Sequence, residues 1–139
     1  MRIKVAEHSG FCFGVREAIR KTEELLEENK NTDKQVVTCG PLIHNKAVTD
    51  DLCSRGLKIV ERLADVEPKS ILVVRSHGEP QSFYDEANRL GLELVDVTCP
   101  NVSKIHRLVK EARDDNRNVV VIGDATHPEV KGIVGWTGG

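Results

Sequence analysis

The chain has 139 residues, of which 39% are hydrophobic and 30% are charged, enough for one globular domain or one and a half small ones. Its formal net charge of −2 gives no indication of non-specific binding to nucleic acid or to anionic lipid. Because no segment approaches the roughly 18 consecutive apolar residues of a membrane span, and the first residues lack the long apolar stretch of a signal peptide, we expect a cytoplasmic protein.

The predicted elements alternate along the chain. Only 4% of the residues are aromatic, so the core must be aliphatic, which suits buried parallel strands. Short apolar runs predict strands at residues 2–6, 35–38, 57–60, 70–75, 93–97 and 118–122. Helical spacing predicts helices at residues 15–29, 45–54, 80–90 and 102–115, and a last one that Pro128 begins and Thr126 caps. This order predicts an α/β fold in which parallel sheets are flanked by helices.

The chain divides most simply near residues 99–101, where a second βα series begins. We expect an N-terminal strand and loop at residues 1–13, a first α/β lobe at 14–98 and the start of a second lobe at 99–139. The second series does not finish, so we expect the chain to be a truncated part of a longer protein.

A Cys or His residue recurs in the loops that follow the predicted strands. They are Cys12, His44, His77, Cys99 and His127. In a parallel sheet all carboxyl ends of strands lie along one edge, where ligands bind, so we expect these side chains to come together. The remaining candidates have a plainer interpretation, as small buried residues or as surface and packing residues: Cys39, Cys53, His8 and His106.

The residue types at this edge indicate two kinds of chemistry. In a chain that is neither short nor loop-rich, a cysteine is a buried thiol, a metal ligand or a nucleophile rather than part of a disulfide framework. Soft thiolates select iron–sulfur clusters, zinc or Cu(I). Histidines beside helix N-termini suit a diphosphate. Glu129, two residues after His127, suits a proton donor, although a carboxylate there also favours the helix dipole.

Five motifs in register carry a family resemblance. They are GFCFGVREA at residues 10–18, GPLIHN at 40–45, RSHG at 75–78, DVTCP at 96–100 and THPE at 126–129. Together they resemble the 4-hydroxy-3-methylbut-2-enyl diphosphate reductase family, which catalyses the last step of the non-mevalonate isoprenoid pathway. The resemblance covers essentially the whole chain.

The resemblance implies a three-lobed fold with pseudo-threefold symmetry around a [4Fe–4S] cluster, of which this chain supplies one complete and one partial lobe. It implies that Cys12 and Cys99 are cluster ligands, and that His44 and His77 bind the diphosphate. It also implies that His127 contacts the substrate and Glu129 supplies the proton. The implied partners are an allylic diphosphate substrate and an electron donor such as flavodoxin or ferredoxin, with no nucleic acid and no membrane.

The same resemblance places a third cluster cysteine and further polar pocket residues beyond residue 139. We therefore expect the chain alone to lack reductase activity, and to fold only partly or as an oligomer.

Two alternatives stay open. One is a zinc or redox protein that uses Cys12, Cys99 and a histidine, and the other is a non-catalytic α/β fragment. Flavodoxin-like and dinucleotide-binding proteins share the fold class, but no G-x-G-x-x-G turn follows the first predicted strand; Gly10 and Gly14 flank a cysteine instead.

Overall fold

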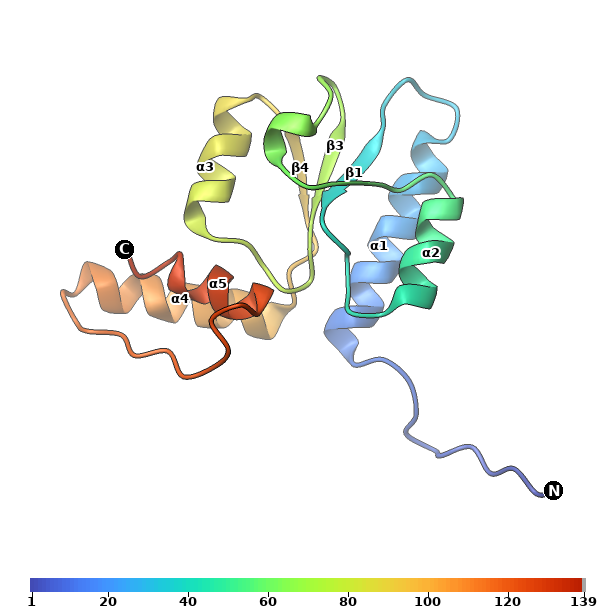
Figure 1. The fold of residues 1–139 in the computed structure, drawn as a ribbon, viewed down its shortest axis with the longest axis horizontal. Coiled ribbons are helices and arrows are strands. Elements are labelled where there is room, and N and C mark those ends of the chain that lie inside the picture. Colours follow the sequence, from blue (N-terminus) through green and yellow to red (C-terminus); the bar gives the residue numbers. More distant parts are fainter. Residues whose placement is uncertain (139) are drawn as a thin grey trace.

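The computed structural model describes residues 1–138, in which helices flank a four-stranded parallel sheet (Figure 1). The strands are β1 (Val36–Cys39), β2 (Lys58–Val60), β3 (Ile71–Val74) and β4 (Glu93–Asp96). The helices are α1 (Phe13–Asn29), α2 (Lys46–Ser54), α3 (Gln81–Arg89), α4 (Pro100–Asp114) and α5 (Pro128–Val134), with a 3-10 turn η1 (Leu63–Asp65). The α/β class that the sequence predicts is confirmed.

The order of the strands places a reversal in the middle of the sheet. The strands lie side by side as β2-β1-β3-β4, and each neighbouring pair is parallel. The chain goes from β1 out to the edge strand β2, then crosses back past β1 to β3 and β4. The loops that leave β1 and β3 therefore diverge, and α/β proteins bind ligands in the crevice at such a point.

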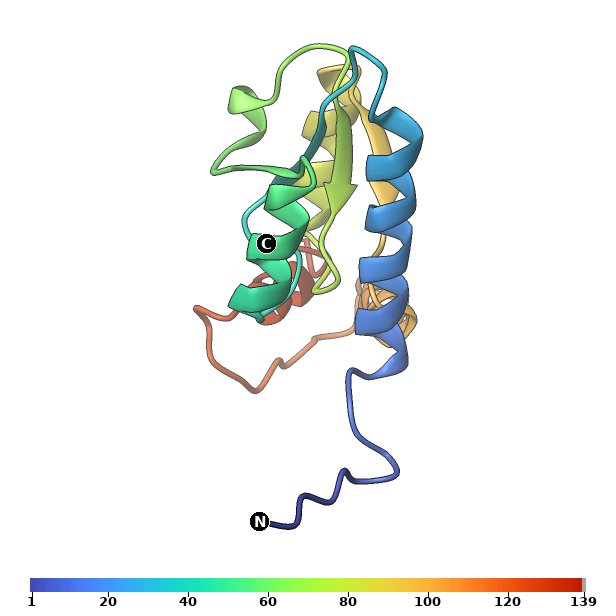
Figure 2. The ribbon, with the colours of Figure 1, turned by 90° about the vertical axis from the view of Figure 1, so that its right-hand side faces the viewer.

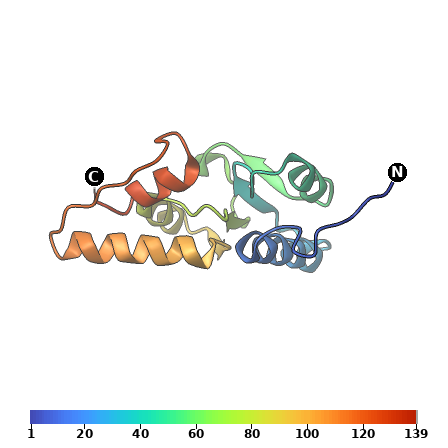
Figure 3. The same ribbon diagram turned by 90° about the horizontal axis from the view of Figure 1, so that it is seen from below.

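Each face of the sheet has its own apolar cluster. Successive side chains of a strand point to opposite faces, so Val36 and Val73 face α1 and α2 whereas Val37 and Leu72 face α3 and η1. Figure 3 shows α1 and α2 on one side of the sheet and α3 on the other. All eight residues of β1 and β3 are buried, which explains why these strands are continuously apolar or small.

Local sequence explains the two helices on the first face. α1 buries one stripe, made by Gly14, Ala18, Thr22 and Leu26 at every fourth position. The buried Thr22 hydroxyl is satisfied because it donates to the Ala18 carbonyl at 2.8 Å. The predicted cap of α2 is also confirmed, since the Asn45 side chain accepts a hydrogen bond from the Val48 amide at 3.1 Å.

α4 and α5 lie together beyond the carboxyl ends of the strands (Figure 1). His106 of α4 is only 5% exposed and stacks on Trp136, with ring centroids 5.5 Å apart. A Cβ at Gly78 would collide with His106 Cε1, so this glycine makes room for the imidazole. His106 is thus a packing residue, one of the two roles that its sequence position indicates.

Two of the predicted strands are wrong. Residues 2–6 and 118–122 form no regular secondary structure, and neither segment pairs with a strand among residues 1–138. Their apolar side chains are exposed, with Val5 at 81% and Ile122 at 95%. The N-terminal segment runs away from the sheet (Figure 2). A strand needs a backbone partner as well as a suitable sequence, and these segments have none here.

The predicted cap of the last helix is displaced by one residue. His127, and not Thr126, is the N-cap of α5, and its Nδ1 accepts from the Glu129 amide at 3.2 Å. The Thr126 hydroxyl is engaged instead with Asp124, to which it donates at 2.7 Å. Within residues 1–138, no helix is both long enough and apolar enough to cross a membrane.

Candidate anion-binding edge

Three histidines from three separate loops meet at the carboxyl edge of the sheet. His44 follows β1, His77 follows β3 and His127 directly precedes α5. The ring centroids are 4.2 Å apart for His44 and His77, 5.2 Å for His44 and His127, and 6.0 Å for His77 and His127. The expected proximity of these side chains is therefore confirmed, although they are up to 83 positions apart in sequence (127 − 44 = 83).

His77 is half-buried just after the end of β3. Its Nδ1 is buried and has no hydrogen-bond partner among the described residues. Burial lowers the pKa of His77 to about 4, and the nearby His44, Arg75 and His127 lower it further in the same direction. Near neutral pH His77 is therefore uncharged and has an unused ring nitrogen, which an oxygen-rich anion can satisfy.

His127 has a defined hydrogen-bonding direction. Because its Nδ1 accepts the Glu129 amide, a neutral His127 ring carries its proton on Nε2. That nitrogen is then a donor available to an acceptor outside the helix. Glu129 is half-buried in the first turn of α5, and its backbone amide is the group that the His127 ring caps.

Cys12 and Cys99 lie at the starts of two adjoining helices. Cys12 is the N-cap of α1 and Cys99 the N-cap of α4, and neither caps with its side chain. A Cβ at Gly14 would lie 2.5 Å from the Cys99 Sγ, so the two helix starts touch through this glycine. The Cys99 amide also donates to the Ser76 carbonyl at 3.0 Å, which ties it to the His77 loop.

The other cysteines have the plainer roles that the sequence indicates. Cys39 is buried at the end of β1, and burial raises the pKa of its thiol to about 11, so it is not a reactive thiolate. Cys53 is exposed on α2. Among residues 1–138, no three His, Cys, Asp or Glu side chains are arranged to hold a metal ion. A zinc site of Cys12, Cys99 and a histidine is therefore not assembled in this part of the chain.

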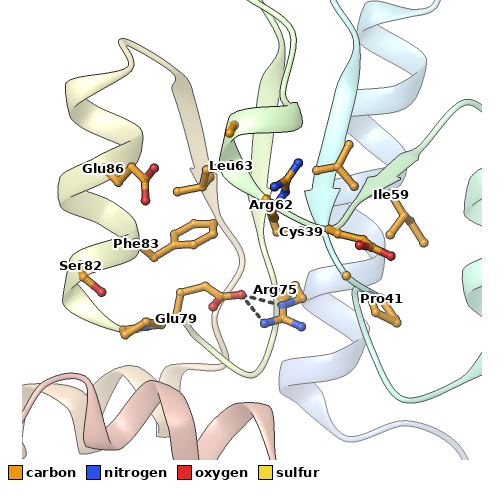
Figure 4. Close-up of a pocket in the computed structure, with 15 residues that line it drawn as sticks. Cys39, Pro41, Ile59, Arg62, Leu63, Arg75, Glu79, Ser82, Phe83 and Glu86 are labelled. Atoms are coloured by element: carbon orange, nitrogen blue, oxygen red, sulfur yellow. Dashed lines mark hydrogen bonds and ion pairs between the residues drawn. The ribbon is translucent and has the colours of Figure 1, made fainter.

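An ion pair near the carboxyl edge of the sheet is not evident from the sequence. Arg75 and Glu79 form an ion pair next to the histidine loops, with Arg75 Nε and Nη2 at 2.6 and 2.5 Å from Glu79 Oε1 (Figure 4). They border a cavity of about 810 Å³ between α3, η1 and the end of β1. None of the three histidines lines this cavity. The only hint in the sequence is an arginine that ends an apolar strand.

The parallel sheet, the reversal between β1 and β3 and the histidines at that point define a class: an α/β protein with a candidate ligand-binding edge at the carboxyl ends of its strands. A family model described as "LytB protein" matches residues 3–139. The chain therefore belongs to the LytB family.

Individual relatives agree with this assignment. The chain is 42% identical over 136 residues to the 4-hydroxy-3-methylbut-2-enyl diphosphate reductase of Clostridioides difficile, covering 98% of this chain and 48% of that protein. It is 43% identical over 136 residues to the enzyme of the same name from Alkaliphilus oremlandii, again covering 98% and 48%. The chain thus spans about half the length of the curated relatives it matches.

Solved structures of this kind share the fold. A structure described as (E)-4-hydroxy-3-methyl-but-2-enyl diphosphate reductase matches with a TM-score of 0.80 at 35% identity, over 96% of this chain and 46% of that one. The E-1-hydroxy-2-methyl-but-2-enyl-4-diphosphate reductase from Plasmodium falciparum matches with a TM-score of 0.86 at 32% identity, over 94% and 40%.

Proposed function

We propose that this chain is the N-terminal part of a reductase that converts (E)-4-hydroxy-3-methylbut-2-enyl diphosphate into isopentenyl and dimethylallyl diphosphates. The reaction removes an allylic hydroxyl as water and consumes two electrons and two protons. A small redox protein such as flavodoxin or ferredoxin is the proposed source of the electrons. Family membership and the names of the relatives support the reaction, and the edge of the sheet supports a division of roles among the residues.

The histidine cluster is the observation that carries the proposal. In this assignment His44 and His77 bind the diphosphate, and His127 donates from Nε2 to the substrate. Three rings within 6.0 Å of one another present several nitrogen donors to one small anion. The buried, unpartnered Nδ1 of His77 supports the same role, because a ligand oxygen would remove the cost of leaving it unsatisfied.

Glu129 is the proposed proton donor. Its backbone amide is held by the His127 ring, so the carboxyl group that donates and the imidazole that binds substrate are positioned by one helix start.

Cys12 and Cys99 fit two of the ligands of an iron–sulfur cluster. Both are free thiols at helix starts that touch through Gly14, where the absence of a side chain leaves room for the Cys99 sulfur. When bound, a [4Fe–4S] cluster supplies electrons and a Lewis-acidic iron. The remaining protein ligand is assigned to the part of the longer protein that follows residue 139.

A titration with inorganic pyrophosphate tests the histidine assignment on this chain. The imidazole resonances of His44, His77 and His127 are followed by heteronuclear NMR. We expect these three to shift together along one saturating curve, because one anion contacts all three rings. His8 is the internal control, since it lies in the exposed N-terminal segment away from any strand.

Replacing single histidines separates specific pyrophosphate binding from non-specific effects of charge. Removing one charge-assisted hydrogen bond costs about 2 kcal/mol, so His77→Asn should weaken pyrophosphate binding by about thirtyfold, and His8→Asn should leave it unchanged. Equal shifts at His8 and at the cluster, or no shift in the cluster at saturating pyrophosphate, would refute the proposed role.

A further inference from the structure

We propose that the Arg75–Glu79 ion pair is a positioning element that holds the His44 and His77 loops in one anion-binding arrangement. The inference rests on the proposed function of the histidine cluster. It adds to that function two residues that do not touch the anion themselves but fix the backbone from which two of its histidines project.

The pair is well shielded in comparison with the other ion pairs of the chain. The Arg75 and Glu79 side chains are 16% and 9% exposed, whereas those of Arg62, which lines the same cavity, and its partner Asp65 are 75% and 38% exposed. Burial raises the pKa of Glu79, and Arg75 opposes this by stabilising the carboxylate. A shielded pair of this kind keeps its geometry, whereas an exposed pair exchanges its partners with water.

Arg75 contacts the loop that carries His44. A Cβ at Gly40 would lie 2.9 Å from Arg75 Nη1, so the guanidinium rests directly on the backbone at the end of β1. Gly40 has a φ of +78°, a conformation that other residues rarely adopt. The glycine therefore gives both the turn and the space for the arginine, and His44 follows it by four residues.

The same pair closes the turn that carries His77. His77 lies between Arg75 and Glu79, and the Gly78 amide donates to the Arg75 carbonyl at 3.0 Å. Next to it, the Ser76 hydroxyl donates to the Leu42 carbonyl at 3.2 Å, which joins the His77 turn to the His44 loop. This hydrogen bond and the packing of Arg75 on Gly40 join the two loops on either side of the reversal in the sheet, and the ion pair fixes the Arg75 side chain that makes the second contact.

The turn also contacts the segment that follows α5. The Trp136 indole donates to the Glu79 carbonyl at 3.0 Å, and a Cβ at Gly135 would collide with Pro80. α5 begins immediately after His127. The Glu79 turn therefore connects all three histidine-bearing segments, although Glu79 itself lines the cavity, which none of the three histidines lines (Figure 4).

The test compares single and double replacements in this chain. Arg75→Met leaves the Glu79 carboxylate buried without its partner, which destabilises the fold for a reason unrelated to positioning. The double variant Arg75→Met/Glu79→Met removes both charges and restores an apolar contact, so it is the informative protein. Arg62→Met removes an arginine from the rim of the same cavity and is the matched control.

Two measurements are made on each variant: the nuclear Overhauser effect between the His44 and His77 ring protons, and the affinity for inorganic pyrophosphate. We expect the double variant to unfold cooperatively, to lose the ring-to-ring effect and to bind pyrophosphate about tenfold more weakly, because its loops populate the binding arrangement less. Arg62→Met should match the unmodified chain in both. Arg75→Lys keeps a positive charge beside Glu79. This variant should therefore keep part of the ring-to-ring effect and of the pyrophosphate affinity that the double variant loses.

A folded double variant with the ring-to-ring effect and the affinity of the unmodified chain would overturn the inference. The ring-to-ring measurement decides the question even without a ligand. If the unmodified chain shows the effect and does not bind pyrophosphate, the proposed function fails, whereas the positioning role is still decided by the variants.

Discussion

The histidine side and the cysteine side of the strand edge differ in how far this chain completes them. Three imidazoles from three loops lie within 6.0 Å of one another, and the Arg75–Glu79 ion pair flanks His77 in its turn. On the other side, Cys12 is exposed, Cys99 is half-buried, and residues 1–138 bring no third metal-ligating side chain to them. We therefore expect one lobe to preorganise the proposed anion site by itself, and the proposed redox group to need ligands from more than one lobe.

The largest expected effect is a complete absence of reductase turnover by this chain. Two thiolates hold an iron–sulfur cluster poorly, so anaerobic reconstitution with iron and sulfide should give little bound iron and no conversion of the allylic diphosphate. Iron content, visible absorbance and product formation are the measurements. Turnover at a normal rate would contradict the expectation that this chain leaves the cysteine side of the strand edge incomplete.

The contact between the two cysteine-bearing helix starts should show a smaller effect. Gly14→Ala places a methyl group against the Cys99 Sγ, and overpacking of this kind costs about 1–3 kcal/mol, offset by about 1 kcal/mol from the better helix propensity of alanine. We expect a lower free energy of unfolding in urea and unchanged histidine resonances.

A double-mutant cycle isolates this contact. Cys99→Ala removes the sulfur that the new methyl group meets, so Gly14→Ala should cost about 1 kcal/mol less in the Cys99→Ala background. Equal costs in both backgrounds would show that the sulfur does not lie against Gly14.

A gradual effect is expected on the histidine side, as a pH dependence of the stability of the fold. An unfolded chain protonates His77 near its ordinary pKa of 6.5, but the folded chain does so only near 4. Between these values the unfolded state binds more protons, so the folded state loses stability as the pH falls from about 6.5 to about 4. The groups that lower the pKa, apart from burial, are His44, Arg75 and His127.

The measurement is the urea unfolding midpoint across this pH range, compared with His77→Asn. The variant lacks the titrating group, so its midpoint should fall less steeply with decreasing pH. Identical slopes for the two proteins would mean that His77 is protonated in the folded chain as readily as in the unfolded one.

The sequence predicts the convergence of the histidines because it depends on topology. Once β1 and β3 are parallel neighbours, the residues that follow them must share one edge, so His44 and His77 meet whatever the details of their loops. The roles of these residues, and of Cys12, Cys99 and Glu129, stay proposals.

The errors have a different physical origin. The alternating pattern at residues 2–6 and the apolar run at 118–122 indicate that a segment can pair, but not that a partner strand is present. Histidine is not among the residues usually expected at an N-cap, so Thr126 is the predicted cap although His127 is the observed one. The Arg75–Glu79 pair is not predictable from periodicity, because its four-residue spacing spans a turn through Gly78, where φ is +72°, and not a helix.

Trp136 is an intrinsic fluorescent probe of the region in which it lies. It is the only tryptophan in the chain, so its fluorescence reports on one place. That place is the junction where the indole stacks on His106 and is hydrogen-bonded to the Glu79 carbonyl. The wavelength of indole emission depends on local polarity and hydrogen bonding. If the α5 segment separates from the histidine-bearing turns, the emission maximum of Trp136 will therefore shift, and no added label is needed to detect it.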